Sequence, residues 1–155
     1  MTARHGPTGL IWCAGILGLL NAAPSVYWAF SGNLLLDTIG QWLIDLRAEI
    51  PVLTGISLLG IALGKTVAVL VPLIAVYVLG QRHVLWWNLA RVIAAALVLY
   101  GAAGLLVNAV LLLWPGVVLA DPTARVGQAL IWYPMLLVWG VVLAVGLRRW
   151  RAQAS

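Results

Sequence analysis

Four long apolar runs, separated by short polar segments, dominate the pattern of this chain. They cover about residues 9–30, 51–79, 85–114 and 128–147. A helix rises about 1.5 Å per residue, so roughly 20 apolar residues cross a hydrocarbon core of ~30 Å. Each run reaches that length. We therefore predict an all-α integral membrane protein whose four transmembrane helices pack as a bundle.

The segment between the first two runs has a different pattern. Over residues 34–48, apolar side chains recur at helical spacing. Three of the chain's four acids, Asp37, Asp45 and Glu49, fall on another face of the same helix. Acids this frequent are not accepted over the ~20 residues needed to cross lipid. We predict an amphipathic helix that lies on the membrane surface between the first two spans.

Composition supports the membrane assignment. Of 155 residues, 64% are hydrophobic and 8% are charged, and the mean hydropathy is +1.06. Soluble globular domains carry about 25% charged residues. The net charge of +5 does not indicate a nucleic-acid partner, because the basic residues flank apolar runs and are not gathered on a soluble face. We expect a single membrane domain, residues 1–155.

The charges between the apolar runs are distributed unequally. One side of the predicted topology receives Arg47, Arg125 and every acid, and the other receives Arg4, Arg82, Arg148, Arg149 and Arg151. Loops rich in lysine and arginine stay on the cytoplasmic side. We therefore expect a multi-pass protein of the cytoplasmic (plasma) membrane with both termini in the cytoplasm.

The sequence offers little for metal binding or catalysis. Cys13 is the single cysteine and lies inside the first run, which excludes a disulfide within the chain. His5 and His83 have no partner at the spacing of metal ligands. Hydrolase and nucleotide motifs are missing. We assign no catalytic residue, metal or cofactor, and leave open whether the chain is an enzyme.

Lys65 is the one charge in the run 51–79 and lies near its middle. An ionisable residue at mid-bilayer costs about 2.5–3.5 kcal/mol on insertion scales and usually faces a bundle interior or a wet cavity. Two interpretations stay open. Lys65 either holds the polar group of an amphiphilic ligand, pointing toward Ala102 and Asn108 of the third span, or is structural and satisfied by the Ala68 carbonyl, hydroxyls or buried water.

Polar residues of the third run extend this candidate ligand site. Asn108 lies on a stripe of small residues, and Asn88 and Arg91 lie on the neighbouring stripe. We expect both stripes to face the bundle. Arg91 lies about 10 Å from the start of its span, so its side chain either snorkels to the surface or binds a lipid phosphate with Asn88. The candidate ligand-binding residues are Lys65, Asn108, Arg91, Asn88, Tyr27 and Trp28.

Small residues also indicate where helices approach closely. Gly60 and Gly64 form a G-x-x-x-G pair, and Ala94 and Gly101 repeat small residues in the third run. A second copy of the chain or another membrane protein is expected to dock on these faces. Two functional classes remain. The first is binding of a membrane lipid or other hydrophobic ligand in the bundle, and the second is a structural or accessory subunit of a membrane complex.

Residues Ser25–Gly32 resemble the His-x-Tyr-Trp-x-x-Gly-Gly-like motif of an uncharacterised, mainly bacterial membrane family, domain-of-unknown-function family 3995. Arg91 and the stretch Trp132-Tyr133-Pro134 are also similar to positions of that family. The resemblance implies a short protein of about four hydrophobic segments and supplies no activity. Ser25 and Ser31 stand where the family has histidine and its first glycine, so no role of that histidine carries over.

Overall fold

A computed structural model describes residues 6–80, 83–116 and 118–154, and these residues form helices and connecting turns without any strand. Four of the helices are long and apolar enough to cross a membrane: Gly9–Ala29, Pro51–Leu79, Val84–Leu113 and Pro122–Gln153. The predicted all-α bundle of four membrane helices is therefore confirmed. Arg4, His5 and Arg82, used above to predict topology and exclude a metal site, lie outside the described residues.

The first two long helices are α1, Gly6–Ala29, and α3, Pro51–Leu73, which continues as the π-helix η1, Ile74–Leu79. Proline lacks an N–H, so Pro72 takes one hydrogen bond out of the helix immediately before this change in helical type. The third long helix is α4, Val84–Leu113.

The last apolar run is helical over more residues than predicted. It begins as α5, Pro122–Gly127, passes through the π-helix η2, Gln128–Trp132, and ends as α6, Tyr133–Ala154. The early start has a local cause, because the Asp121 side chain caps the first turn and proline suits the first helical position.

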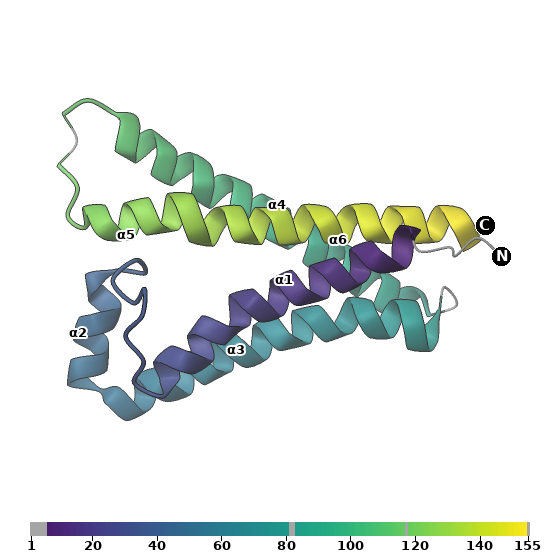
Figure 1. Cartoon of the computed structure of the whole chain (residues 1–155), viewed down its shortest axis with the longest axis horizontal. Helices are drawn as coiled ribbons and strands as arrows, with labels where there is room; N and C mark the ends of the chain where they lie inside the picture. The colour runs from purple at the N-terminus through teal and green to yellow at the C-terminus, as the bar shows by residue number, and fades with distance from the viewer. Residues whose placement is uncertain (1–5, 81–82, 117, 155) are drawn as a thin grey trace.

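The long helices form two antiparallel pairs, α1 with α3 and α4 with α6 (Figure 1). The pairs meet along α1 and α6, and α3 approaches α4 where η1 ends and α4 begins. The start of α1 and the end of α6 lie at this same end (Figure 1). We call it the basic end, because the last turns of α6 carry Arg148, Arg149 and Arg151.

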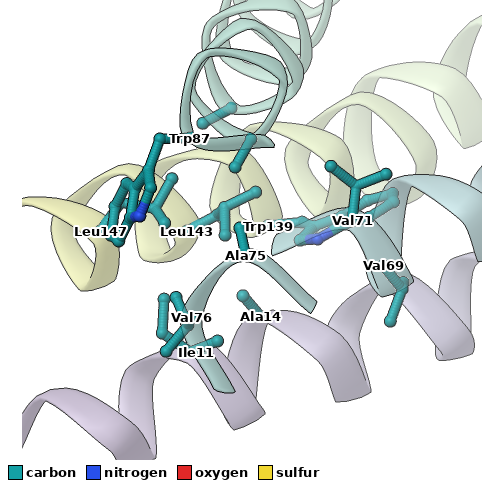
Figure 2. Packing of buried hydrophobic residues seen from close by; sticks show 12 residues of the cluster. Ile11, Ala14, Val69, Val71, Ala75, Val76, Trp87, Trp139, Leu143 and Leu147 are labelled. Carbon is teal, nitrogen blue, oxygen red and sulfur yellow. The ribbon is translucent and has the colours of Figure 1, made fainter. Parts of the chain in front are cut away.

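The core of the basic end collects side chains from all four long helices (Figure 2). Its largest members are Ile11, Trp87, Trp139, Leu143 and Leu147. A Cβ placed on Gly18 of α1 would overlap both Val69 and Trp139. Glycine therefore lets α3 and α6 approach α1 closely, and such van der Waals packing holds helices together in lipid.

A second, smaller core lies at the opposite end of the bundle. It consists of Trp28, Leu36, Leu43, Leu58 and Trp132. The rings of Trp28 and Trp132 pack edge to face with their centroids 5.3 Å apart. Trp28 Nε1 also donates to the carbonyl of Leu34 at 2.8 Å, so its polar atom is satisfied within the core.

The predicted amphipathic helix at 34–48 is only partly correct. The helix α2 covers Gln41–Glu49, whereas the residues before it form turns. Leu35 has φ of 58° and Gly40 has φ of 143°, and neither value fits a right-handed helix. From Gln41 onward the prediction holds, because α2 lies across the end of the bundle and does not run along it (Figure 1).

Helix α4 buries one stripe and not the two that its pattern suggested. The buried stripe contains Ala90, Ala94, Gly101 and Asn108. The neighbouring stripe is exposed at Asn88, Arg91, Ala95 and Ala102, so the expectation that it faces the bundle is wrong. The reason is that α4 packs on α6 along its length but meets α3 only near the basic end. With α6 as its one neighbour over most of its length, α4 buries one face.

Candidate ligand-binding site

Two glycines set the register between α4 and α6. A Cβ on Gly101 would lie 2.6 Å from the backbone nitrogen of Leu137, and a Cβ on Gly140 would lie 2.8 Å from the backbone nitrogen of Val98. The helices are antiparallel, so each step back along α4 matches a step forward along α6. Ten residues from the first contact, this register places Arg91 level with Leu147, which precedes Arg148.

A groove of about 700 Å³ opens beside this contact between α4 and α6. Its polar lining consists of Asn88, Arg91, Arg148 and Arg151. The rest of its lining is apolar and comprises Trp87, Val92, Ala94, Ala95, Val98, Leu99, Ala144 and Leu147. Alanines on both helices leave the space open, and the volume falls in the range of about 300–1,000 Å³ common for ligand sites. The groove combines basic side chains with an apolar wall.

A smaller cavity of about 160 Å³ adjoins the groove and is lined by Val84, Trp87, Asn88, Arg91 and Arg151. Four of these residues line both spaces, so the polar side chains stand at the junction between them. Trp87 is a fixed part of this junction. It is 8% exposed, and its Nε1 donates to the carbonyl of Gly80 at 3.1 Å. Its side chain packs in the core of the basic end.

The junction carries positive charge that the described residues do not neutralise. Arg91, Arg148 and Arg151 line the groove, and no acidic residue lines either cavity in the described part of the chain. Guanidinium groups stay charged at every physiological pH and present forked donors that match phosphate or carboxylate oxygens. Arg149 is exposed and lines neither cavity. The arrangement is suited to an anionic group attached to an apolar body.

Lys65 lies apart from this groove and faces α1. Its Nζ donates to the backbone carbonyl of Asn21 at 3.0 Å and to the Ser25 hydroxyl at 3.2 Å. The expectation that it points toward Ala102 and Asn108 is wrong, since α3 packs on α1 and Ala102 is exposed. The structural interpretation fits these contacts, although the carbonyl belongs to Asn21 and not to Ala68.

Asn108 is paired at the opposite end of the bundle. Its Nδ2 donates to the carbonyl of Gly104 at 2.8 Å, and its Oδ1 accepts from Arg125 Nη1 at 3.3 Å. The side chain is 2% exposed and links α4 to α5. Lys65 and Asn108 therefore do not form the shared site that the sequence suggested.

The two aromatic candidates also lie outside the groove. Trp28 is 3% exposed and belongs to the core beside α2. Tyr27 is half-exposed, and its ring lies against the backbone of Gly32. Of the six residues predicted as ligand-binding, the structure brings together Arg91 and Asn88.

Arg148 and Arg151 were missed as site residues, because charges after the last apolar run were assigned to topology alone. Their spacing of three does place them on one face of α6. The missing information was the register of α6 against α4, which the two glycine contacts supply.

The proposed docking faces separate into a free pair and a buried pair. A Cβ on Gly60 or Gly64 would meet nothing within 4 Å, so this face of α3 is open. Ala94 is 2% exposed, and Gly101 packs on the backbone of α6. The inclusion of Ala94 and Gly101 in a partner surface is therefore wrong, because these residues make the contact between α4 and α6.

No protein-family model matches this chain, and comparison with curated proteins and with solved structures finds no match either. Within the residues that the structure describes, no three His, Cys, Asp or Glu side chains come together as metal ligands. The groove is therefore interpreted from its own geometry and charge.

Proposed function

We propose that this protein binds an anionic membrane lipid in the groove between α4 and α6. The observation that carries the proposal is the convergence of Arg91, Arg148 and Arg151 on one largely apolar groove, which no acid among the described residues lines. A lipid headgroup at the junction contacts the guanidinium groups and the Asn88 amide, while an acyl chain follows the wall formed by Val92, Val98 and Leu99.

The proposed orientation puts the basic end at the cytoplasmic face of the plasma membrane, with both termini in the cytoplasm. Arginines at the end of α6 support this orientation through the positive-inside preference. Arg91 lies about 10 Å into α4, at a depth where its side chain reaches headgroups. Anionic lipids of the inner leaflet attract such basic residues by about 1 kcal/mol for each charge near the surface.

The proposal is tested by native mass spectrometry of protein extracted in mild detergent. We expect anionic phospholipid to remain bound to the wild type and to Arg149→Gln, because Arg149 lies outside the groove. Arg91→Gln and the double variant Arg148→Gln/Arg151→Gln should lose the lipid while keeping their helical circular dichroism. Equal lipid retention in all four proteins would contradict the proposal.

The alternative function is that of a structural or accessory subunit. It is favoured by the open face at Gly60 and Gly64, where a second helix can approach the backbone of α3 closely. The same spectra test it, because a stoichiometric protein partner or a dimer that Gly60→Leu/Gly64→Leu removes would support this function. Monomeric protein with bound lipid would favour the groove.

A further inference from the structure

The basic groove carries more positive charge than an ordinary phospholipid headgroup neutralises. Three arginines line it, two of them, Arg91 and Arg151, also line the smaller cavity, and no described acid faces either space. Like charges brought together beside an apolar wall repel one another more strongly than in water. A ligand with a single negative charge leaves two guanidinium charges unbalanced, whereas a dianion leaves one.

We infer that the groove takes a phosphomonoester lipid, an apolar chain or diacyl body that ends in an unsubstituted phosphate. This inference rests on the proposed function and names its ligand class. A phosphomonoester carries about −1.5 to −2 charges at pH 7 and has three strong acceptor oxygens. A phosphodiester headgroup carries one charge on two free oxygens, and a fatty-acid carboxylate carries one charge as well.

The positions of the donors agree with three free oxygens. Arg91 comes from α4, and Arg148 and Arg151 come from two successive turns of α6, so arginines line the groove on both walls. A guanidinium pairs with phosphate through two parallel N–H donors. The Asn88 amide, which lines both cavities, adds a neutral donor at the same place.

The apolar part of the groove requires that the phosphate belong to a lipid. Leu99 lies eight residues beyond Arg91 on α4, about 12 Å further along the helix by its rise. The lining between them includes Val92, Ala95 and Val98, and α6 contributes Ala144. An inorganic phosphate leaves this wall uncovered, whereas a chain attached to the phosphate covers it.

The test compares lipids that share their acyl chains and differ in the headgroup. Detergent-purified protein is titrated with phosphatidic acid, phosphatidylglycerol and phosphatidylcholine, and bound lipid is counted by native mass spectrometry. We expect phosphatidic acid to bind roughly tenfold more tightly than phosphatidylglycerol. Its second negative charge interacts with the two arginines that a single charge leaves unbalanced. Phosphatidylcholine should bind most weakly. Arg148→Gln should bring phosphatidic acid close to phosphatidylglycerol, and Arg149→Gln should leave the preference unchanged.

A further variant and a competitor separate charge from geometry and lipid from free phosphate. Arg91→Lys keeps the charge but loses the forked donor, so we expect it to weaken phosphatidic acid binding less than Arg91→Gln does. Dodecyl phosphate should displace phosphatidic acid, and inorganic phosphate at the same concentration should not. Displacement by inorganic phosphate would contradict a lipid ligand.

The outcomes distinguish this inference from the function on which it rests. Equal binding of phosphatidic acid and phosphatidylglycerol, with both lost in Arg91→Gln, would overturn the phosphomonoester and leave anionic lipid binding in place. Anionic lipid binding that is the same in the wild type and Arg91→Gln would overturn both.

Discussion

The carboxylate of Asp121 accepts a hydrogen bond from the backbone N–H of Gln41 at 2.7 Å, across 80 positions of sequence. Its other oxygen accepts from the N–H of Ala124 at 3.0 Å. One side chain thus accepts from the first N–H group of α2 and caps the first turn of α5. Trp132 Nε1 donates to Thr38 Oγ1 and Gln128 Nε2 donates to the carbonyl of Ile39, so the segment before α2 is held to the last helix at several points.

The Asp121 caps predict a specific dependence of stability on pH. The backbone N–H groups of Ala124 and Gln41, with a smaller contribution from the Arg125 guanidinium, hold the pKa of Asp121 below its ordinary value. A lowered pKa in the folded state stabilises the protein above the ordinary pKa near 4, and this stabilisation is lost as the pH falls through the folded value. We expect Asp121→Asn to lower the melting temperature at pH 7 and to lower it by less at pH 3, where protonation of Asp121 weakens the wild-type caps.

Asp37 provides the matched control for that experiment. It is an exposed acid in the turns that precede α2. Asp37→Asn should leave the melting temperature at pH 7 within about 1 °C of the wild type, since exposed substitutions away from caps have small effects. Circular dichroism melts at the two pH values decide the matter, and equal melting of Asp121→Asn and wild type at pH 7 would refute the role of the caps.

Ser31 occupies a backbone conformation that favours glycine. Its φ is 66°, its N–H donates to the carbonyl of Trp28, and the N–H of Gly32 donates to the carbonyl of Tyr27. These two bonds form the Schellman motif that ends many helices with glycine at this position. A residue with a side chain costs roughly 1 kcal/mol in this conformation, and the greater freedom of unfolded glycine offsets part of it. We expect Ser31→Gly to stabilise the protein by about 0.5 kcal/mol.

The control for Ser31 is the same substitution within a helix. Ser57 is exposed inside α3, in its second turn, where glycine is destabilising by up to about 1 kcal/mol. Thermal melts in detergent should therefore shift in opposite directions for Ser31→Gly and Ser57→Gly. A lower melting temperature for both would show that the left-handed turn is not the source of strain.

Gly101 and Gly60 should respond differently to the addition of one methyl group. The new Cβ at position 101 would press on the backbone of Leu137, which has no flexible end that can move aside. Overpacking of this kind costs about 1–3 kcal/mol. We expect Gly101→Ala to lower the melting temperature by several degrees and Gly60→Ala, which faces open space, to leave it unchanged or slightly raised. A lower melting temperature for Gly60→Ala, with Gly101→Ala unchanged, would contradict this prediction. It would mean that the close helix contact lies at Gly60 and not at Gly101.

Lys65 should be dispensable for the lipid groove. Its two acceptors lie on α1. Without Lys65, the Ser25 hydroxyl can donate a hydrogen bond to the carbonyl of Asn21, four residues earlier. We expect Lys65→Met to retain bound lipid and to melt no lower than the wild type, because it deletes a cation at mid-membrane without leaving a buried group unpaired. Lipid loss in this variant, measured by native mass spectrometry beside Arg91→Gln, would move the ligand site to α1 and α3.

Lys65→Glu reverses the charge at this position, whereas Lys65→Met removes it. A carboxylate at this place would face the carbonyl oxygen of Asn21, and the single proton of the Ser25 hydroxyl could pair with only one of its two oxygens. The protein should therefore melt at a clearly lower temperature than the Lys65→Met variant.

The four spans could be predicted from sequence because run length and apolarity decide whether a helix crosses lipid. The face that each helix buries could not be predicted in the same way, because it depends on how many neighbouring helices the helix contacts. The buried stripe of α4 through Ala94 and Gly101 was recognised, but the next stripe was assigned inward on the assumption that α4 has neighbours on both sides. Its exposure is what creates the groove beside Arg91.

Which residues form the site depends on how the helices pack against one another, and the pattern within a single helix does not show this. Asn88 and Arg91 were identified because they share one face of one helix. Arg148 joins them only through the register set at Gly101 and Gly140, and a sequence without aligned relatives does not report such a register. Lys65 illustrates the same limit, since it was predicted to point toward α4 and instead contacts α1.

The contact between α1 and α6 has a consequence for the order in which the protein is made. Chains emerge from the ribosome N-terminus first, so α1, α3 and α4 enter the membrane before α6 exists. Until then Ile11, Ala14 and Ala94 lack the tryptophan and leucine side chains of α6 that complete their core. The nascent chain must therefore hold α1 and α4 in the bilayer, or against insertion factors, as half-covered helices. During this interval the incomplete bundle is more accessible to quality-control proteases, and the packing of α6 ends that exposure.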